Sequence, residues 1–180
     1  MAREANSSAL VSFGIVLLLG MFLFVLPAQA ASSPPLKIAV FDFELEDVSA
    51  AGTATSGDTA REATRMQAVT AEARRVLVQS GRYRIVDTSG AEAEVLKDKP
   101  LRNCNGCEAG IALKLGAERS LIGVVTRVAQ TEYYVSVRIM DTASDQVVKQ
   151  ESAFFTGADD AWASGVAMLL KHQVLAEPSH

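Results

Sequence analysis

Residues 36–45 (LKIAVFDFEL) constrain the fold most, because apolar side chains occupy both alternating faces of this segment. β-branched and aromatic residues are common in it, which favours a strand over a helix. A strand that is apolar on both faces has to be covered on both sides. The segment therefore predicts a central strand of a sheet that lies between layers.

Helical and strand patterns alternate along the rest of the chain. An amphipathic helix is expected after the polar loop 49–59, with apolar residues three and four positions apart: Met66, Val69, Ala73, Val76 and Leu77. Gly81 stands where the C-cap of this helix belongs. The later segments are a strand at 82–87, a brief helix at 89–96, a helix at 107–115, strands at 121–128, 133–141 and 146–155, and a helix at 159–175.

This order of segments predicts an α+β fold with a mixed five-stranded sheet and helices packed on it. The first strand, helix and strand imply a parallel pair joined by a right-handed crossover. The last two strands are separated by the turn-rich sequence TASD (142–145), which favours an antiparallel hairpin.

The N-terminus has the pattern of a signal peptide. Residues 10–26 form an apolar run, and PAQA follows with Ala28 and Ala30 in the A-x-A arrangement of a cleavage site. An uncleaved anchor is the alternative, although about 18 to 20 apolar residues are needed to span a bilayer. We expect cleavage of residues 1–30 after Ala30. The mature chain, 31–180, would be one domain with a lead-in at 31–35 and a tail at 176–180.

The composition narrows the compartment and the partners. No cysteine lies near the cleavage site, so a lipoprotein anchor is excluded, and we expect a soluble, Sec-exported protein of the periplasm with no span after cleavage. The net charge is −4, and the longest basic cluster is ARR at 73–75. Nucleic acid is therefore not expected as a partner. The chain also lacks a phosphate-binding glycine loop, a G-x-S-x-G and an H-E-x-x-H, so we expect neither a cofactor nor enzyme activity.

Four segments resemble the N-terminal domain of the periplasmic protein TolB, whose fold is shared with curli-secretion and lipoprotein activator domains. They are KIAVFDFEL (37–45), SGRYRIVDTS (80–89), GAERSLIGVVTRV (116–128) and VSVRIMDTASDQVV (135–148). The resemblance implies an anticodon-binding-like α/β fold over most of residues 36–170.

The chain is also similar to a bacterial family of secreted proteins filed as domain of unknown function 2380. The shared features are FDFEL (41–45), a C-x-x-C before the segment LGA (115–117), and a closing G-x-[DT]-[DE]-x-W motif formed by Gly157, Asp159, Asp160 and Trp162. Ala161 stands where that motif would have a serine or another polar residue. The family implies a fold and a secreted location, and no activity, because a fold does not imply a function.

Cys104 and Cys107 are the only cysteines and form the C-x-x-C. Haem attachment would need a histidine where Glu108 stands, and zinc would have only His172 and His180 as further ligands. Redox activity stays open, because we expect Cys104 at a helix N-cap, which favours a thiolate. However, the preceding loop is polar, and none of the prolines is placed to face the pair. We predict a structural disulfide, with thiol–disulfide chemistry as the alternative.

Asp42, Glu44, Glu46 and Asp47 form the densest group of carboxylates. Asp42 and Glu44 are expected on one strand face, where their oxygens could hold a hard cation. Acidic side chains at the end of a strand often face the ligand crevice of an α/β sheet. We treat all four as candidate binding residues. The alternatives are a solvated strand end and a loop cap formed by Asp42.

Asp160 and Trp162 are further candidate binding residues, because the family motif includes them. In the simplest interpretation Asp160 belongs to a helix N-terminus and Trp162 packs in the core. Of the adjacent Tyr133 and Tyr134, one should pack inward, and the other could belong to an exposed aromatic patch for a partner.

We therefore expect a non-enzymatic binding or accessory protein of the bacterial envelope that contacts another periplasmic or envelope protein. A periplasmic thiol–disulfide protein that uses Cys104 and Cys107 is one alternative. A metal carrier that uses Asp42 and Glu44 is the other, although we predict no metal site. The sequence leaves the partner and the oligomeric state open.

Overall fold

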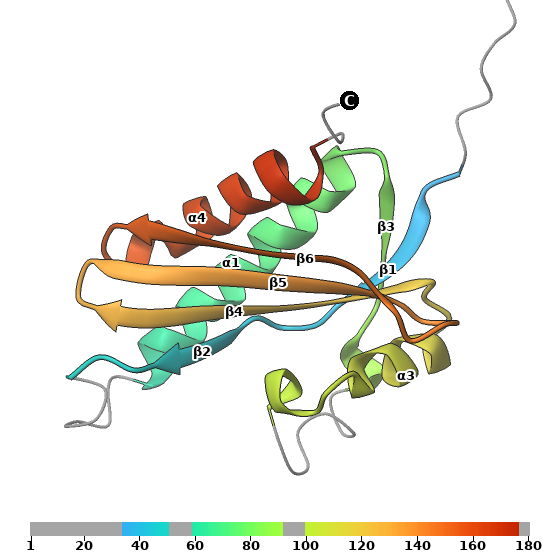
Figure 1. Cartoon of the computed structure of the whole chain (residues 1–180), viewed down its shortest axis with the longest axis horizontal. Coiled ribbons are helices and arrows are strands. Elements are labelled where there is room, and N and C mark those ends of the chain that lie inside the picture. Colours follow the sequence, from blue (N-terminus) through green and yellow to red (C-terminus); the bar gives the residue numbers. More distant parts are fainter. Residues whose placement is uncertain (1–33, 51–58, 92–99, 177–180) are drawn as a thin grey trace, which may run out of the picture. The chain divides into compact units, whose positions relative to one another are not determined.

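The computed structural model describes residues 34–50, 59–91 and 100–176, in which a six-stranded mixed sheet carries helices on both faces (Figure 1). The expected signal peptide, 1–30, lies outside these residues, and so does most of the loop at 49–59. No helix within the described ranges has the length and apolar character needed to cross a membrane.

The sheet combines parallel and antiparallel strands. Its members are β1 (Leu36–Val40), β2 (Glu44–Asp47), β3 (Tyr83–Val86), β4 (Arg119–Ala129), β5 (Glu132–Asp141) and β6 (Val147–Thr156). The order is β3-β1-β4-β5-β6, and β2 also pairs with β4. β1 runs parallel to β3 and β4, and β2 runs parallel to β4, whereas β4, β5 and β6 are antiparallel. The α+β class and the mixed sheet predicted from the sequence are confirmed.

The expected count of five strands was wrong, because the strand predicted at 36–45 is divided in two. Val40 pairs with Leu121 and Glu44 with Val124, so three residues of the first chain segment oppose two residues of β4. Such an extra residue is a bulge. The Phe43 ring lies against Gly123, where an added Cβ would come within 2.1 Å of the ring. The glycine therefore makes room for the ring at the bulge.

Three α-helices and four short helical segments complete the described fold. The α-helices are α1 (Thr59–Gln79), α3 (Cys107–Lys114) and α4 (Trp162–Leu169). The short segments are η1 (Ser89–Ala91), η2 (Leu101–Asn103), η3 (Asp159–Ala161) and the π-helical η4 (Leu170–Val174). Gly81 follows α1 with a φ of 71°, as its predicted capping role requires. The brief helix expected at 89–96 begins as η1, and its remainder falls outside the described residues.

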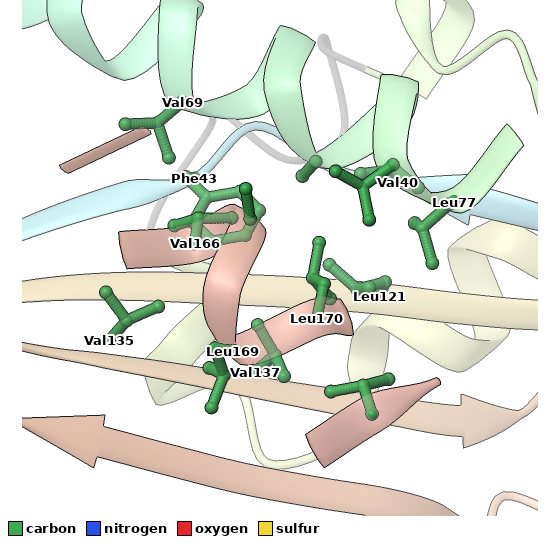
Figure 2. Packing of buried hydrophobic residues seen from close by; sticks show 14 of the residues in the cluster. Val40, Phe43, Val69, Leu77, Leu121, Val135, Val137, Val166, Leu169 and Leu170 are labelled. Atoms are coloured by element: carbon green, nitrogen blue, oxygen red, sulfur yellow. The ribbon is translucent and has the colours of Figure 1, made fainter. Parts of the chain in front are cut away.

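α1 and α4 cover one face of the sheet and form the main core. In Figure 2, Val69 and Leu77 of α1 and Leu169 of α4 lie in the same cluster as Val135 and Val137 of β5. A second, smaller cluster lies on the opposite face, under α3 and η2. Its buried members are Ala39, Phe41, Ala91, Leu101, Ala112, Ala117 and Ile122. Both faces of the segment 36–45 are therefore covered, as its apolar pattern predicted.

Candidate functional site

Adjacent tyrosines on β5 face opposite sides of the sheet. Tyr133 is 2 % exposed, its ring lies against those of Phe155 and Trp162, and its hydroxyl donates to the Ala161 carbonyl at 3.0 Å. Tyr134 is 47 % exposed. The expectation that one tyrosine would pack inward and the other would lie at the surface is confirmed.

Tyr134 is part of an exposed aromatic pair. It lies opposite Phe154 of β6, with the ring centroids 5.1 Å apart in an edge-to-face arrangement, and Phe154 is also 47 % exposed. α3 and η2 cover the other end of this face, where Phe41, Leu101 and Ile122 are buried. Large aromatic groups that stay in water side by side are typical of interaction surfaces.

The surroundings of the aromatic pair are polar and hollowed. Ser136 and Ser152 form the next cross-strand pair on the same face. A shallow cavity of about 150 Å³ follows, lined by Arg102, Ile122, Val124, Ser136, Val137, Arg138 and Gln150. In the described part of the chain β6 pairs only with β5, so its outer edge has no strand beside it. This end of the face offers apolar contact area, hydrogen-bonding groups and a strand edge.

A charged cluster centred on Arg127 lies at the end of the opposite face. The guanidinium contacts Asp47 at 2.6 Å, Glu62 at 3.0 Å and Asp159 at 3.2 Å. Its central carbon also lies 5.0 Å from the centroid of the Trp162 ring. Arg127 thereby connects β4 with β2, α1, η3 and α4.

Electrostatics in this cluster favour the charged forms of Arg127 and Asp47. Burial opposes the charge on Arg127, but hydrogen bonding to Glu62 and the charges of Asp159 and Asp47 outweigh it and raise the pKa of Arg127. Burial likewise opposes ionisation of Asp47. Hydrogen bonds from Ser49 and from Arg127 outweigh it, so the pKa of Asp47 is lowered. Three carboxylates already surround Arg127, which makes the cluster a structural junction and a poor site for an anion.

The junction explains the closing motif of the sequence. Asp159 pairs with Arg127 and, at 2.6 Å, with Arg65, while Trp162 is 1 % exposed beneath the Arg127 guanidinium. Asp160 is exposed and borders a cavity of about 720 Å³ next to the cluster. Of the two candidate binding residues in this motif, Trp162 therefore lies in the core and Asp160 lies at the surface.

The structure does not bring the four strand-end carboxylates together. Asp42 lies in the bulge with its side chain 69 % exposed, and it pairs with Arg74 of α1 at 3.1 Å. Glu44 accepts hydrogen bonds from the Leu101 amide at 2.5 Å and from the Arg102 guanidinium at 2.7 Å. Asp42 and Glu44 therefore hold partners from different elements and do not converge on one point.

The other two carboxylates are also separated. Glu46 accepts a hydrogen bond from the Thr126 hydroxyl at 3.1 Å, whereas Asp47 contacts Arg127. A calcium ion needs six to eight oxygen ligands around one point, and this arrangement directs the carboxylates to separate cations and donors. Across the described ranges, the grouping of three residues with ligand atoms close enough for a metal is Cys104, Cys107 and Glu108.

Cys104 and Cys107 lie at disulfide distance, with 2.10 Å between their Sγ atoms and 5.5 Å between their Cα atoms. The expected position of Cys104 at a helix N-cap was wrong. Gly106 is the N-cap of α3, Cys107 is its first residue, and Cys104 is the C-cap of η2. Asn105 and Gly106 between them have φ values of 53° and 106°, so the pair closes a left-handed turn instead of a helical one.

Glu108, which the sequence patterns did not identify as a site residue, is 0 % exposed. Its Oε1 accepts hydrogen bonds from Arg138 Nε at 2.9 Å and Nη2 at 2.5 Å, and its Oε2 lies 3.5 Å from Cys104 Sγ. The sequence does contain a signal for a buried ion pair at Glu108, because Glu108 is the sole carboxylate in the largely apolar helix CEAGIALK.

Arg127 was missed as well. In the alternating pattern of β4 it shares a face with Leu121 and Val125, both fully buried, and a charged residue at such a position implies a buried partner.

A family model described as "Protein of unknown function (DUF2380)" matches residues 36–174. No curated protein sequence matches the chain significantly.

Several solved structures are similar in outline. The LpoB C-terminal domain from Salmonella enterica has a TM-score of 0.49 and 13% identity, with 71% of this chain and 87% of that chain covered. The PelC dodecamer from Paraburkholderia phytofirmans gives 0.46 and 16%, with 77% and 88% covered. TolB from Acinetobacter baumannii gives 0.44 and 12%, with 79% and 29% covered. At these identities and scores the likenesses carry nothing about activity or partners.

Proposed function

The chain belongs to the family of proteins of unknown function DUF2380, and we propose that it is a non-enzymatic accessory protein of the bacterial envelope. It is exported to the periplasm, its signal peptide is removed after Ala30, and it acts by contact with another periplasmic or envelope protein. The observation that carries this proposal is the aromatic pair of Tyr134 and Phe154 on a part of the sheet that no described helix covers.

The aromatic pair has the properties of a binding hot spot. Tyrosine is enriched among the residues that dominate interface energies, and such residues are surrounded by polar groups that exclude water on contact. Ser136, Ser152 and the cavity of about 150 Å³ provide such surroundings. Both rings are carried by paired strands, so little conformational entropy would be lost when a partner binds.

Variants of the aromatic pair test the proposal. The full chain is expressed with a C-terminal tag in its host, cross-linked in intact cells and purified, and co-purified proteins are quantified by mass spectrometry. We expect one partner to be retained by the wild type and lost by Tyr134→Ser and by Phe154→Ser. Met168→Ser is the matched control, because Met168 is 53 % exposed on α4, which packs on the other face of the sheet.

The outcomes separate the parts of the proposal. Equal recovery of every co-purified protein by the wild type and both aromatic variants would exclude this surface as the contact. Intact-mass measurement of the purified chain should give a mature start at Ala31. An uncleaved, membrane-retained chain would contradict the export and cleavage part of the proposal. It would not contradict the proposed contact through Tyr134 and Phe154.

A further inference from the structure

A buried carboxylate is directed at the Cys104–Cys107 disulfide. Glu108 is fully buried, and its Oε1 is held by two hydrogen bonds from the Arg138 guanidinium. Its Oε2 lies 3.5 Å from Cys104 Sγ. A disulfide sulfur has no proton to donate, so the oxidised protein gives this carboxylate oxygen no hydrogen bond from the cysteine.

Reduction of the disulfide would give Glu108 Oε2 a hydrogen-bond donor. A Cys104 thiol would donate its proton to Glu108 Oε2, and a buried carboxylate gains more from a donor than a neutral acceptor does. The contact therefore stabilises the reduced form relative to the disulfide. A disulfide that serves only as a staple would gain nothing from a buried acceptor beside one of its sulfurs.

The two sulfurs differ in access. Cys107 is exposed and is the first residue of α3, where the helix dipole favours a thiolate. Cys104 is partly buried and packs against the second hydrophobic cluster beside Glu108. An incoming thiolate can therefore reach Cys107, and Cys104 is the sulfur that leaves.

We propose that Cys104 and Cys107 form a thiol-exchange site, in which Cys107 is attacked by a dithiol and Glu108 binds the released Cys104 thiol. The thiolate of the dithiol forms a bond to Cys107 Sγ, the Cys104–Cys107 bond breaks, and Cys104 leaves as a thiolate that takes up a proton from water. The second thiol of the dithiol then loses its proton, attacks the mixed disulfide and releases Cys107. The dithiol loses two electrons and two protons, and the protein gains them as two thiols. This activity is independent of the proposed contact through Tyr134 and Phe154.

The redox equilibrium of a Glu108 variant tests this site. The full-length wild type and Glu108→Gln are equilibrated in buffers of reduced and oxidised glutathione, and free thiols are trapped with a maleimide and counted by mass. Glutamine offers only a neutral acceptor, so we expect the equilibrium constant for reduction to fall about tenfold, which moves the midpoint about 30 mV towards more reducing buffers. Glu132→Gln, at an exposed position, is the control and should keep the wild-type midpoint. Equal midpoints for the wild type and a folded Glu108→Gln would overturn the proposal.

A second measurement tests the site without Glu108→Gln, in case that variant does not fold. Cys104→Ser leaves Cys107 as the single thiol, and Cys107→Ser leaves Cys104. With oxidised glutathione, we expect the Cys107 thiol to form the mixed disulfide at least about tenfold faster, because it is exposed and lies at the helix N-terminus. Equal rates, or a faster Cys104, would overturn the assignment of Cys107 as the attacked sulfur.

Discussion

The two faces of the sheet can be compared at Tyr133 and Tyr134, which are adjacent on β5. Tyr133 faces α4 and is 2 % exposed, whereas Tyr134 faces away from it and is 47 % exposed. The face under α1 and α4 holds the large core and the Arg127 junction. The other face is covered by α3 at one end only, and its free end carries the Tyr134–Phe154 pair. The comparison indicates that the first face provides most of the stability, and the proposed function assigns the contact with a partner to the second.

Replacement of Trp162 should have the largest effect. Trp162 is 1 % exposed and contacts Tyr133 and Arg127, so Trp162→Ala should lower the free energy of unfolding by about 3 to 5 kcal/mol. Tyr134→Ala removes one exposed cross-strand partner and should cost less than about 1 kcal/mol. Urea titrations of both variants make the comparison. Similar losses for the two would show that the faces do not differ in this way.

A side chain at Gly123 should have the next largest effect. Gly123→Ala would place a Cβ within 2.1 Å of the Phe43 ring, and overpacking of this kind costs about 1 to 3 kcal/mol. The double variant with Phe43→Leu should lose less than the sum of the two single losses, because the ring no longer occupies that space. Thermal unfolding of all three gives the coupling. Additive losses would mean that the bulge does not depend on this contact.

Acid should weaken the junction through Asp47. Its pKa is lowered in the folded protein, because hydrogen bonds from Ser49 and the Arg127 guanidinium outweigh burial. The resulting stabilisation is present above the carboxyl's usual range and is lost as pH falls through the lowered folded-state pKa. We expect the wild type to lose stability between about pH 5 and pH 2 more steeply than Asp47→Asn. Parallel pH profiles would contradict a stabilising role of the ionised Asp47.

Asp42→Asn should have the smallest effect. The Asp42 side chain is 69 % exposed and its contact with Arg74 is a surface ion pair, which is worth about 0 to 1 kcal/mol. Chemical denaturation should therefore give a midpoint close to that of the wild type. Global unfolding of Asp42→Asn, together with a stable Trp162→Ala, would contradict the assignment of Asp42 to the surface and of Trp162 to the core.

Periodicity predicted most of the elements. The strands expected at 82–87, 121–128, 133–141 and 146–155 are present, and the helix expected at 107–115 is observed at Cys107–Lys114. These patterns succeed because each depends on residues close in sequence. The bulge at 41–43 could not be predicted in this way, because it depends on the absence of a side chain at Gly123, a residue on another strand.

The site residues were harder to predict than the elements. Arg127 takes its partners from positions 47, 62 and 159, and Glu108 takes its partner from position 138. Ion pairs across such distances in sequence leave no local periodicity. The acidic strand end has a strong local pattern, but the structure directs its carboxylates to different elements. Composition identified these charges, and only the three-dimensional arrangement identified their partners.

Oxidative footprinting in a periplasmic extract tests the central claim most directly. Hydroxyl radicals modify exposed aromatic and methionine side chains, so Tyr134, Phe154 and Met168 should all react in the purified chain. In the extract we predict that Tyr134 and Phe154 are protected, while Met168 on α4 reacts as before. Unchanged reactivity of the aromatic pair, or protection of Met168 instead, would contradict the assignment of contact to the face that carries Tyr134 and Phe154.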